Sequence, residues 1–246
     1  KKFGDASKNV LIEEFLDGIE LSVFVITDGK NYVMLPEAKD YKRIGEKDTG
    51  PNTGGMGAIS PVSFANETFL KKVEEKIIKK TIEGIQTDEI EYKGFLFIGL
   101  MNVRGEPYVI EYNVRMGDPE TQVVIPRIEN DLLEVIIKCI DGELNKIKIK
   151  SLNKFVSTVI LASNGYPNSY KKGDKINNLE EIDESIIFHA GTKNNKGNIE
   201  SNGGRVLAAT GFGETIEDAL SKSYTIANNI SWKNKYFRRD IGKDLI

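Results

Sequence analysis

Short apolar runs separated by turn residues open the chain. They lie at residues 9–16 (NVLIEEFL), 21–27 (LSVFVIT) and 31–35 (NYVML). Asp28 and Gly29 separate the second run from the third, and Asp-Gly between apolar runs favours a hairpin because both residues tolerate positive φ. We therefore expect three antiparallel strands at the start of the chain.

Residues 36–62 have a different pattern. Charged residues come first, then the glycine- and proline-rich stretch TGPNTGGMGAISP, and periodicity is weak throughout. This composition is typical of a long loop. From Phe69 onward, apolar residues recur at helical spacing and predict a helix of several turns. These positions are Leu70, Val73, Ile77, Ile78, Ile82 and Ile85.

A second hairpin is predicted where GFLFIGLMNV and PYVIEYNV flank Arg104 and Gly105. Both runs are rich in the apolar and aromatic residues that strands favour, so we expect two long, well-buried strands. A further helix is expected from about Asp131 to Asp141, where Gly142 ends it.

The apolar pattern lapses between residues 143 and 154, which are polar and rich in lysine, and we interpret this stretch as a linker. Thr215, with Asp218 three residues later, predicts a capped helix start near the end of the chain. Strand-like runs precede it at residues 155–162, 186–192 and 204–211. We predict a first domain at 1–148 and a smaller one at 149–246.

Composition excludes several classes of protein. The net charge is -3 and basic residues are scattered, so no nucleic-acid partner is indicated. No run is long and apolar enough for a membrane span and no signal peptide is evident. The single cysteine, Cys139, rules out a disulfide within the chain. We expect a cytoplasmic protein with small-molecule partners.

Candidate chemistry begins with the spacing of Glu111, Asn113 and Arg115. Side chains two residues apart share one face of a strand. Such a face can simply be solvated. However, the neighbouring runs YVI and FLFIGLM are apolar, which favours a cleft. A carboxylate and an amide oxygen suit Mg²⁺ bound with phosphates, and an arginine suits a further anion.

Two other features are less specific. The glycines of TGPNTGGMGAISP could direct backbone N–H groups at an anion. A glycine-rich surface loop has the same composition. Neither of two known nucleotide-binding motifs, the P-loop and G-x-G-x-x-G, is present. The lone histidine, His189, is more typical of a partly buried strand-edge residue than of a catalytic one.

Taken together and in order, several motifs resemble the phosphoribosylamine-glycine ligase family of the ATP-grasp superfamily over practically the whole chain. They are IEEFLDGIE, KDTGPNTGGMGAISP, GFLFIGLM, VIEYNVRMGDPETQ, FHAGT, NGGRVL and YFRRDIG. The resemblance implies an α+β fold. It comprises an ATP-grasp large lobe, which is an antiparallel sheet with flanking helices, part of the small lobe, and a small mixed α/β carboxy-terminal domain.

The resemblance also implies an activity. With Mg²⁺ or Mn²⁺, ATP would convert glycine into glycyl phosphate and ADP. The amine of 5-phosphoribosylamine would then attack glycyl phosphate to give glycinamide ribonucleotide and phosphate, a step of purine biosynthesis. Such chemistry depends mostly on positioning and charge neutralisation.

Carried over residue by residue, the family pattern makes Glu111 and Asn113 metal ligands and Arg115 the catalytic cation. The nucleotide would contact Glu13, Glu14, Phe15 and Leu16, and Glu20 would accept the ribose hydroxyls. The substrate side would be lined by Gly54, Gly55, Met56, Gly57, Asp118 and Glu120.

Two departures from the family pattern bear on activity. No acid occurs in FLFIGLMNV, where many ATP-grasp enzymes place another metal ligand. The chain also opens on Lys1, inside the ATP-grasp region, without the amino-terminal domain of the family. We therefore expect an incomplete fragment that is inactive in isolation. The alternatives are a non-catalytic nucleotide-binding module and another ATP-grasp amine ligase.

Overall fold

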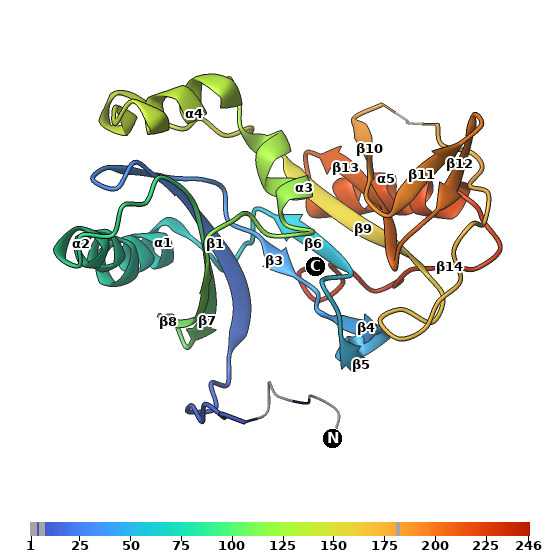
Figure 1. Ribbon diagram of the computed structural model, residues 1–246, viewed down its shortest axis with the longest axis horizontal. Helices are drawn as coiled ribbons and strands as arrows, with labels where there is room; N and C mark the ends of the chain where they lie inside the picture. The colour runs from blue at the N-terminus through green and yellow to red at the C-terminus, as the bar shows by residue number, and fades with distance from the viewer. Residues whose placement is uncertain (1–3, 5–7, 181–182) are drawn as a thin grey trace.

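The predicted turn at Asp28 and Gly29 joins the first two strands in the computed structural model, which describes residues 4, 8–180 and 183–246 (Figure 1). Lys1, at which the sequence opens, lies outside the described residues. A four-stranded antiparallel sheet has the order β2-β1-β7-β8. Its strands are β1 (Ile19–Thr27), β2 (Tyr32–Met34), β7 (Gly94–Val103) and β8 (Glu106–Asn113). Both predicted hairpins are therefore confirmed.

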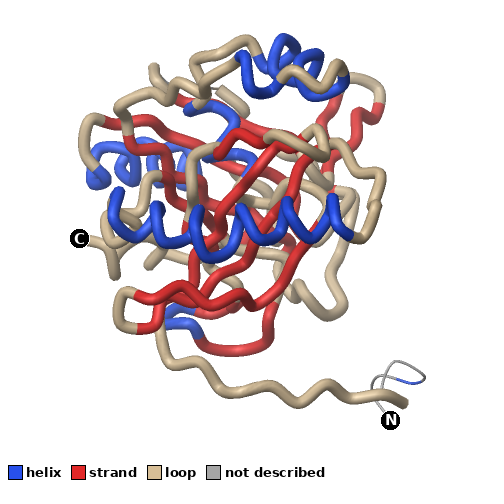
Figure 2. The backbone as a smooth tube through the Cα atoms, turned by 90° about the vertical axis from the view of Figure 1, so that its left-hand side faces the viewer, coloured by secondary structure: helices blue, strands red, loops and turns tan. Residues whose placement is uncertain are grey.

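A long helix lies across one face of this sheet (Figure 2). It comprises α1 (Glu67–Val73), a π-helical turn (Glu74–Ile78) and α2 (Lys79–Thr87), and Asn66 caps it by accepting a hydrogen bond from Phe69 N (3.0 Å). Its apolar side packs on the alternate residues Leu21, Val23 and Val25 of β1. The predicted helix is confirmed.

Shorter helices cover the opposite face. They are α3 (Thr121–Val124), a 3-10 turn (Ile125–Arg127), α4 (Leu132–Ile140) and a 3-10 turn (Leu144–Lys146). Asp131 caps α4 through Leu133 N (2.8 Å), as the predicted helix requires. Cys139 is buried, and its thiol donates to Thr27 O at 3.1 Å. Among the described residues, no helix combines the length and apolar character that crossing a bilayer requires.

A second sheet has the order β10-β13-β9-β6-β3, and β14 pairs with β9. The strands are β3 (Lys39–Asp40), β6 (Gly57–Ser60), β9 (Phe155–Ser163), β10 (Ser185–His189), β13 (Arg205–Gly213) and β14 (Lys235–Tyr236). Helix α5 (Ile216–Asn229) packs on β13 and β9. This sheet draws strands from both sides of the proposed 148/149 boundary, which stays a prediction.

Residues 36–62 are not one loop, and that expectation is wrong. They contain β3, β6 and a small hairpin of β4 (Arg43–Gly45) and β5 (Thr49–Asn52). These strands are two to four residues long, too short to produce a readable alternation, and a 3-10 turn spans Glu46–Asp48 between β4 and β5.

A second small hairpin lies near the end of the chain. It consists of β11 (Thr192–Asn195) and β12 (Asn198–Ser201).

The strand predicted at residues 9–16 is also wrong. This segment has no regular structure and runs away from both sheets (Figure 1). Its apolar side chains are exposed, including Leu11 at 81% and Phe15 at 88%, except for the half-buried Leu16. An apolar run forms a strand only where a neighbour supplies backbone partners, and no described strand pairs with this segment.

The expectation of two well-buried strands is wrong for β8. β7 is buried along its middle, but β8 is the edge strand and its residues 108–112 are exposed. On the helix side, the Tyr112 hydroxyl of β8 lies 2.8 Å from the Thr81 hydroxyl of α2, within hydrogen-bonding distance. Apolar composition indicated a strand correctly, but it did not reveal the edge position.

The Thr215 cap gives a first test of the fold. Its Oγ1 accepts a hydrogen bond from Asp218 N at 3.2 Å, as predicted. We expect Thr215→Ala to lower the free energy of unfolding by about 1 kcal/mol, because one helix N–H loses its partner. Urea unfolding measures the loss. Thr225→Ala, an exposed site within the same helix, should change stability by less than about 0.5 kcal/mol, and equal losses would contradict the cap's role.

Candidate active site

The edge strand β8 presents its polar residues where it ends. Glu111 pairs with Gly99 and Asn113 with Phe97 on the neighbouring strand, so both point to the same face. A Cβ added at Gly99 would lie 3.1 Å from Glu111 Cγ, so the glycine leaves room for the carboxylate side chain. Arg115 follows two residues beyond the strand.

A cavity of about 160 Å³ collects these side chains with others from distant parts of the sequence. Of the predicted residues, it is lined by Glu111, Asn113, Arg115, Gly54, Asp118 and Glu120. Gly117, which belongs to the same turn as Asp118, lines it too, as do residues that the sequence did not single out: Asp40, Lys42, Thr53 and Phe97. One cavity thus holds oxygen donors, two cations and several carboxylates.

The oxygen donors fit a divalent cation that is shared with phosphates. Within the described part of the chain, the side chain of Glu111 makes no hydrogen bond or ion pair, and Asn113 Oδ1 has only a long contact of 3.5 Å with Arg115 NH2. Among the described residues, no three acidic, histidine or cysteine side chains are arranged so that they could hold a metal ion by themselves. A carboxylate and an amide oxygen are suitable hard ligands for Mg²⁺, which commonly keeps phosphate oxygens and waters as its other ligands.

Lys42 is the cation that sequence reasoning missed. Its ammonium forms an ion pair with Glu20 at the margin of the cavity. Burial lowers the pKa of Lys42, but the bond to Glu20 and the charges of Asp40 and Glu111 outweigh this and raise it overall. Lys42 therefore stays charged. The available signal was the two-residue spacing of Asp40 and Lys42 beside the glycine-rich stretch.

Two acids face the same cavity: Glu120, which is buried, and Asp40, which is half-buried. Glu120 is 3% exposed, and its Oε1 accepts a hydrogen bond from Ser22 Oγ at 2.9 Å. Burial raises the pKa of Glu120, and hydrogen bonds only partly offset the rise. Burial raises the pKa of Asp40 well above its ordinary value, and the nearby charge of Glu120 raises it further. Proton affinity at this carboxylate pair is therefore unusually high for acidic side chains.

The glycine-rich stretch does not offer a row of free N–H groups. Gly54 N donates to Tyr166 OH (2.9 Å), Gly55 N to Thr53 Oγ1 (3.0 Å) and Met56 N to Tyr41 O (2.8 Å). The hypothesis of an anion cradle is therefore wrong for these three groups. Met56 is fully buried in the core and Gly57 begins β6, so neither lines the cavity, and nor does Gly55.

Arg205 from β13 holds the glycine-rich stretch against the turn that carries Asp118. Its NH1 donates to Gly54 O at 2.6 Å and to Asp118 O at 2.7 Å, and its NH2 to Asp118 Oδ2 at 2.8 Å. The second sheet thus shapes the cavity floor, although no residue of that strand was predicted to belong to the site.

The predicted nucleotide contacts lie elsewhere. Glu13, Glu14 and Phe15 are exposed and Leu16 half-buried in the segment before β1, outside the cavity. Glu20 joins the site only through Lys42. The lone histidine, His189, is exposed on edge strand β10, with Nδ1 3.0 Å from Thr192 Oγ1. The nucleotide-binding roles of residues 13–16 and of Glu20 stay predictions.

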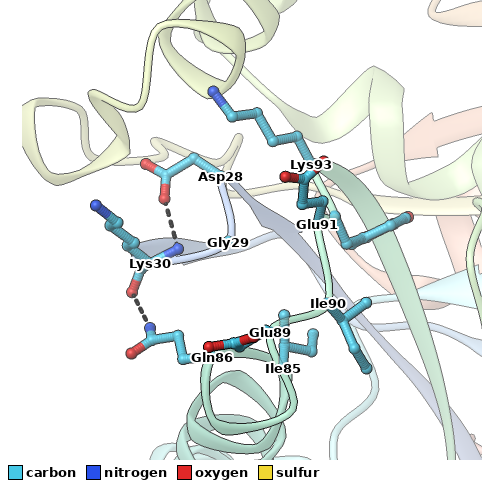
Figure 3. Close-up of a pocket in the computed structure, with 10 residues that line it drawn as sticks. Asp28, Gly29, Lys30, Ile85, Gln86, Glu89, Ile90, Glu91 and Lys93 are labelled. Carbon is cyan, nitrogen blue, oxygen red and sulfur yellow. Dashed lines mark hydrogen bonds between the residues drawn. The ribbon is translucent and has the colours of Figure 1, made fainter.

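A larger cavity of about 1060 Å³ lies between the β1–β2 turn and the connection from α2 to β7 (Figure 3). Its lining mixes acids, lysines and apolar residues. Asp28 on its wall accepts hydrogen bonds from Lys30 N (2.9 Å) and Asn31 N (2.6 Å), so this carboxylate stabilises its own turn. The candidate chemistry therefore lies in the smaller cavity.

The antiparallel sheet and the carboxylate, amide and arginine at the end of its edge strand define an ATP-grasp protein. A family model described as phosphoribosylglycinamide synthetase, ATP-grasp (A) domain, matches residues 1–121, and a model of the C domain of the same enzyme matches residues 156–244. The chain belongs to the phosphoribosylglycinamide synthetase family.

Curated relatives agree with this assignment. Phosphoribosylamine-glycine ligase of Vibrio parahaemolyticus is 45% identical over 243 residues, which is 98% of this chain and 57% of that protein. A bifunctional purine biosynthetic protein of Pichia angusta is 47% identical over 244 residues, which is 98% of this chain and 31% of that protein. The chain thus spans little more than half the length of its single-function bacterial relative.

Solved structures agree as well. The crystal structure of phosphoribosylamine-glycine ligase from Thermotoga maritima is 39% identical, with a TM-score of 0.84, and the match covers 93% of this chain and 56% of that one. Biotin carboxylase of Campylobacter jejuni has a TM-score of 0.64 at 15% identity, covering 92% of this chain and 48% of that chain. The second likeness concerns the fold alone.

Proposed function

We propose that the protein containing this chain is an ATP-dependent ligase that joins glycine to 5-phosphoribosylamine through glycyl phosphate. The observation that carries the proposal is the meeting of Glu111, Asn113 and Arg115 with Lys42 and Glu120 in one cavity of a chain of this family. The products are glycinamide ribonucleotide, ADP and phosphate.

In the first step, a glycine carboxylate oxygen attacks the γ-phosphorus of ATP, and the bond from phosphorus to the ADP oxygen breaks. Negative charge is spread over the phosphoryl oxygens at this point, so fixed cations stabilise the transition state. Arg115 supplies this charge at the end of β8. Lys42, kept charged by Glu20, supplies a second positive group.

Mg²⁺ or Mn²⁺, held by Glu111 and Asn113, would neutralise the ATP phosphates when bound. Both ions accept carboxylate and amide oxygens, so this donor pair suits either of them.

In the second step, the amine nitrogen of 5-phosphoribosylamine attacks the carbonyl carbon of glycyl phosphate. The new C–N bond forms, phosphate departs with the electrons of the C–O bond, and the nitrogen releases a proton. Asp118 and Glu120 lie on the cavity wall where we place the substrates. The remaining contacts to ATP and phosphoribosylamine belong, in this proposal, to the part of the relatives that this chain does not span.

Phosphate release tests the function directly. The native-length protein, with ATP and Mg²⁺, should release phosphate only when glycine and 5-phosphoribosylamine are both present. With glycine labelled by ¹⁸O in its carboxyl group, one labelled oxygen should appear in the released phosphate, because that oxygen bridges carbon and phosphorus in the acyl phosphate. Omitting each substrate in turn is the control.

Other outcomes would select another function. Phosphate release that depends on a different acid or amine would indicate another ATP-grasp amine ligase. Binding of ATP without phosphate release under any combination would indicate a non-catalytic nucleotide-binding module. The cytoplasmic location of the protein remains a prediction that fractionation of the native cells can test.

A further inference from the structure

Two side chains from the second sheet hold Gly54 through its own backbone. The N–H of this glycine donates to the hydroxyl of Tyr166 at 2.9 Å, and its carbonyl accepts from Arg205 NH1 at 2.6 Å. Tyr166 lies in the turn after β9, and Arg205 is the first residue of β13. Because Gly54 lines the candidate active-site cavity, the second sheet fixes a piece of the cavity wall in both directions along the chain.

Close packing accompanies these hydrogen bonds. A Cβ added at Gly54 would lie 2.8 Å from Arg205 Cζ, so the guanidinium lies directly against the backbone of the wall. A Cβ added at Gly204 would lie 2.2 Å from Tyr166 Cδ2, so the tyrosine ring lies against the residue that precedes Arg205. Gly204 and Arg205 both belong to the motif NGGRVL, which thus places the two side chains next to each other.

Arg205 also holds the turn that carries Asp118. Its NH1 donates to Asp118 O at 2.7 Å and its NH2 to Asp118 Oδ2 at 2.8 Å. Gln122 Nε2 donates to the other carboxylate oxygen of Asp118 at 3.0 Å. One guanidinium therefore joins Gly54 to Asp118, and these two residues form a single braced wall of the cavity.

This wall faces solvent on its outer side. Gly54 is exposed, and strand β5, which lies just before it in the chain, is exposed along its whole length. Displacing Gly54 would admit water to the cavity. Water would then attack the carbonyl carbon of glycyl phosphate and break the C–O bond to phosphate, which regenerates glycine and releases phosphate and a proton. Excluding water is a general way to prevent such loss of a reactive intermediate.

We propose that Tyr166 and Arg205 are positioning residues that keep this wall closed over the acyl phosphate, so that the amine rather than water attacks it. This assignment rests on the proposed function and gives the second sheet a part in it. Neither side chain lines the cavity, so each acts through Gly54 or Asp118.

The number of phosphates released for each amide formed tests this role. Loss of folded protein lowers both rates equally and leaves their ratio unchanged, whereas an open wall raises the ratio. The native-length wild type, with ATP, Mg²⁺, glycine and 5-phosphoribosylamine, should release one phosphate for each glycinamide ribonucleotide. Tyr166→Phe, which removes only the hydroxyl, and Arg205→Met should each release about two or more, because water competes with the amine for the intermediate.

Tyr170→Phe is the matched control. This ring packs edge-on against Tyr166, with ring centres 6.3 Å apart, and its hydroxyl makes no hydrogen bond with the described residues. Tyr170→Phe should keep the wild-type ratio. Thermal unfolding is measured for each variant, and Tyr166→Phe provides the test if Arg205→Met does not fold.

Two failures can be told apart. One phosphate for each amide in folded variants of Tyr166 and Arg205 would overturn the positioning role and leave the proposed function intact. A wild type that forms no amide from glycine and 5-phosphoribosylamine would overturn the proposed function and the positioning role with it.

Discussion

Replacing Glu111 by alanine is expected to lower ATP-dependent phosphate release about 100-fold or more, the range seen when one fixed group that stabilises transition-state charge is removed. The reason is that Glu111 is the only carboxylate of the proposed metal pair, and the amide of Asn113 alone carries no charge to hold a divalent ion. Initial rates measured over a range of Mg²⁺ concentrations would show both a lower maximum and a higher Mg²⁺ requirement.

Stability should change little in the same variant. Glu111 is exposed on an edge strand, so the free energy of unfolding should shift by less than about 0.5 kcal/mol. Glu106→Ala, which removes an acid from the same strand outside the cavity, should keep most of the activity. Full activity of the Glu111→Ala protein at limiting Mg²⁺ would eliminate the metal role.

The second large effect concerns stability and falls on Arg238, which is 1% exposed. Its guanidinium donates to both carboxylate oxygens of Asp240 at 2.8 Å, to Asp48 Oδ1 at 2.8 Å and to Arg43 O at 3.0 Å. It therefore fastens the β4–β5 hairpin to the end of the chain. We expect Arg238→Met to lower the free energy of unfolding by about 2–3 kcal/mol, because half-buried Asp240, whose side chain is 17% exposed, loses two charged hydrogen bonds. Urea unfolding of the native-length protein measures this loss.

The neighbouring Arg239 provides the control. It is exposed, with its guanidinium 5.0 Å from the centre of the Phe237 ring, and Arg239→Met should cost no more than about 1 kcal/mol. If the two variants lost similar amounts of unfolding free energy, the buried hydrogen bonds of Arg238 would not be the source of its stabilising effect.

We expect low pH to reduce the loss of unfolding free energy that Arg238→Met causes. Burial raises the pKa of Asp240, but the bonds from Arg238 and from Lys47 N outweigh this and lower it overall. A carboxyl whose pKa is lower in the folded state contributes stability above its unfolded pKa of about 3.9. That contribution disappears as the pH falls through the folded value. The stability gap between wild type and Arg238→Met should therefore narrow in strong acid.

Local elements could be predicted from the sequence because their causes are local. The turn at Asp28 and Gly29 needs only backbone tolerance of positive φ, and Gly29 has φ 91°. Thr215 caps its helix through an N–H three residues away. The long helix after Asn66 follows from apolar residues repeating with the helical period.

Strand burial and pairing could not be predicted in the same way. The apolar runs at residues 9–16 and 106–113 have similar strand-like composition, yet the first is unpaired and the second is an exposed edge. Short strands such as β3 carry too few residues for any period to appear. Whether a strand is central, on an edge or absent depends on neighbours that lie far away in the sequence.

The sequence by itself determined the β1–β2 and β7–β8 hairpins, the long helix after Asn66, helices α4 and α5, the Thr215 cap, and the common face of Glu111 and Asn113. Each of these depends on residues within a few positions of one another. Only the tertiary structure decided that Asp40, Lys42 and Glu120 share a cavity with that face, and that Arg205 holds two of its walls together. Apart from Glu120, which follows Glu111 within ten positions, these contacts join residues about 70 to 150 positions apart. The packing of two sheets, rather than any local preference, brings such residues together.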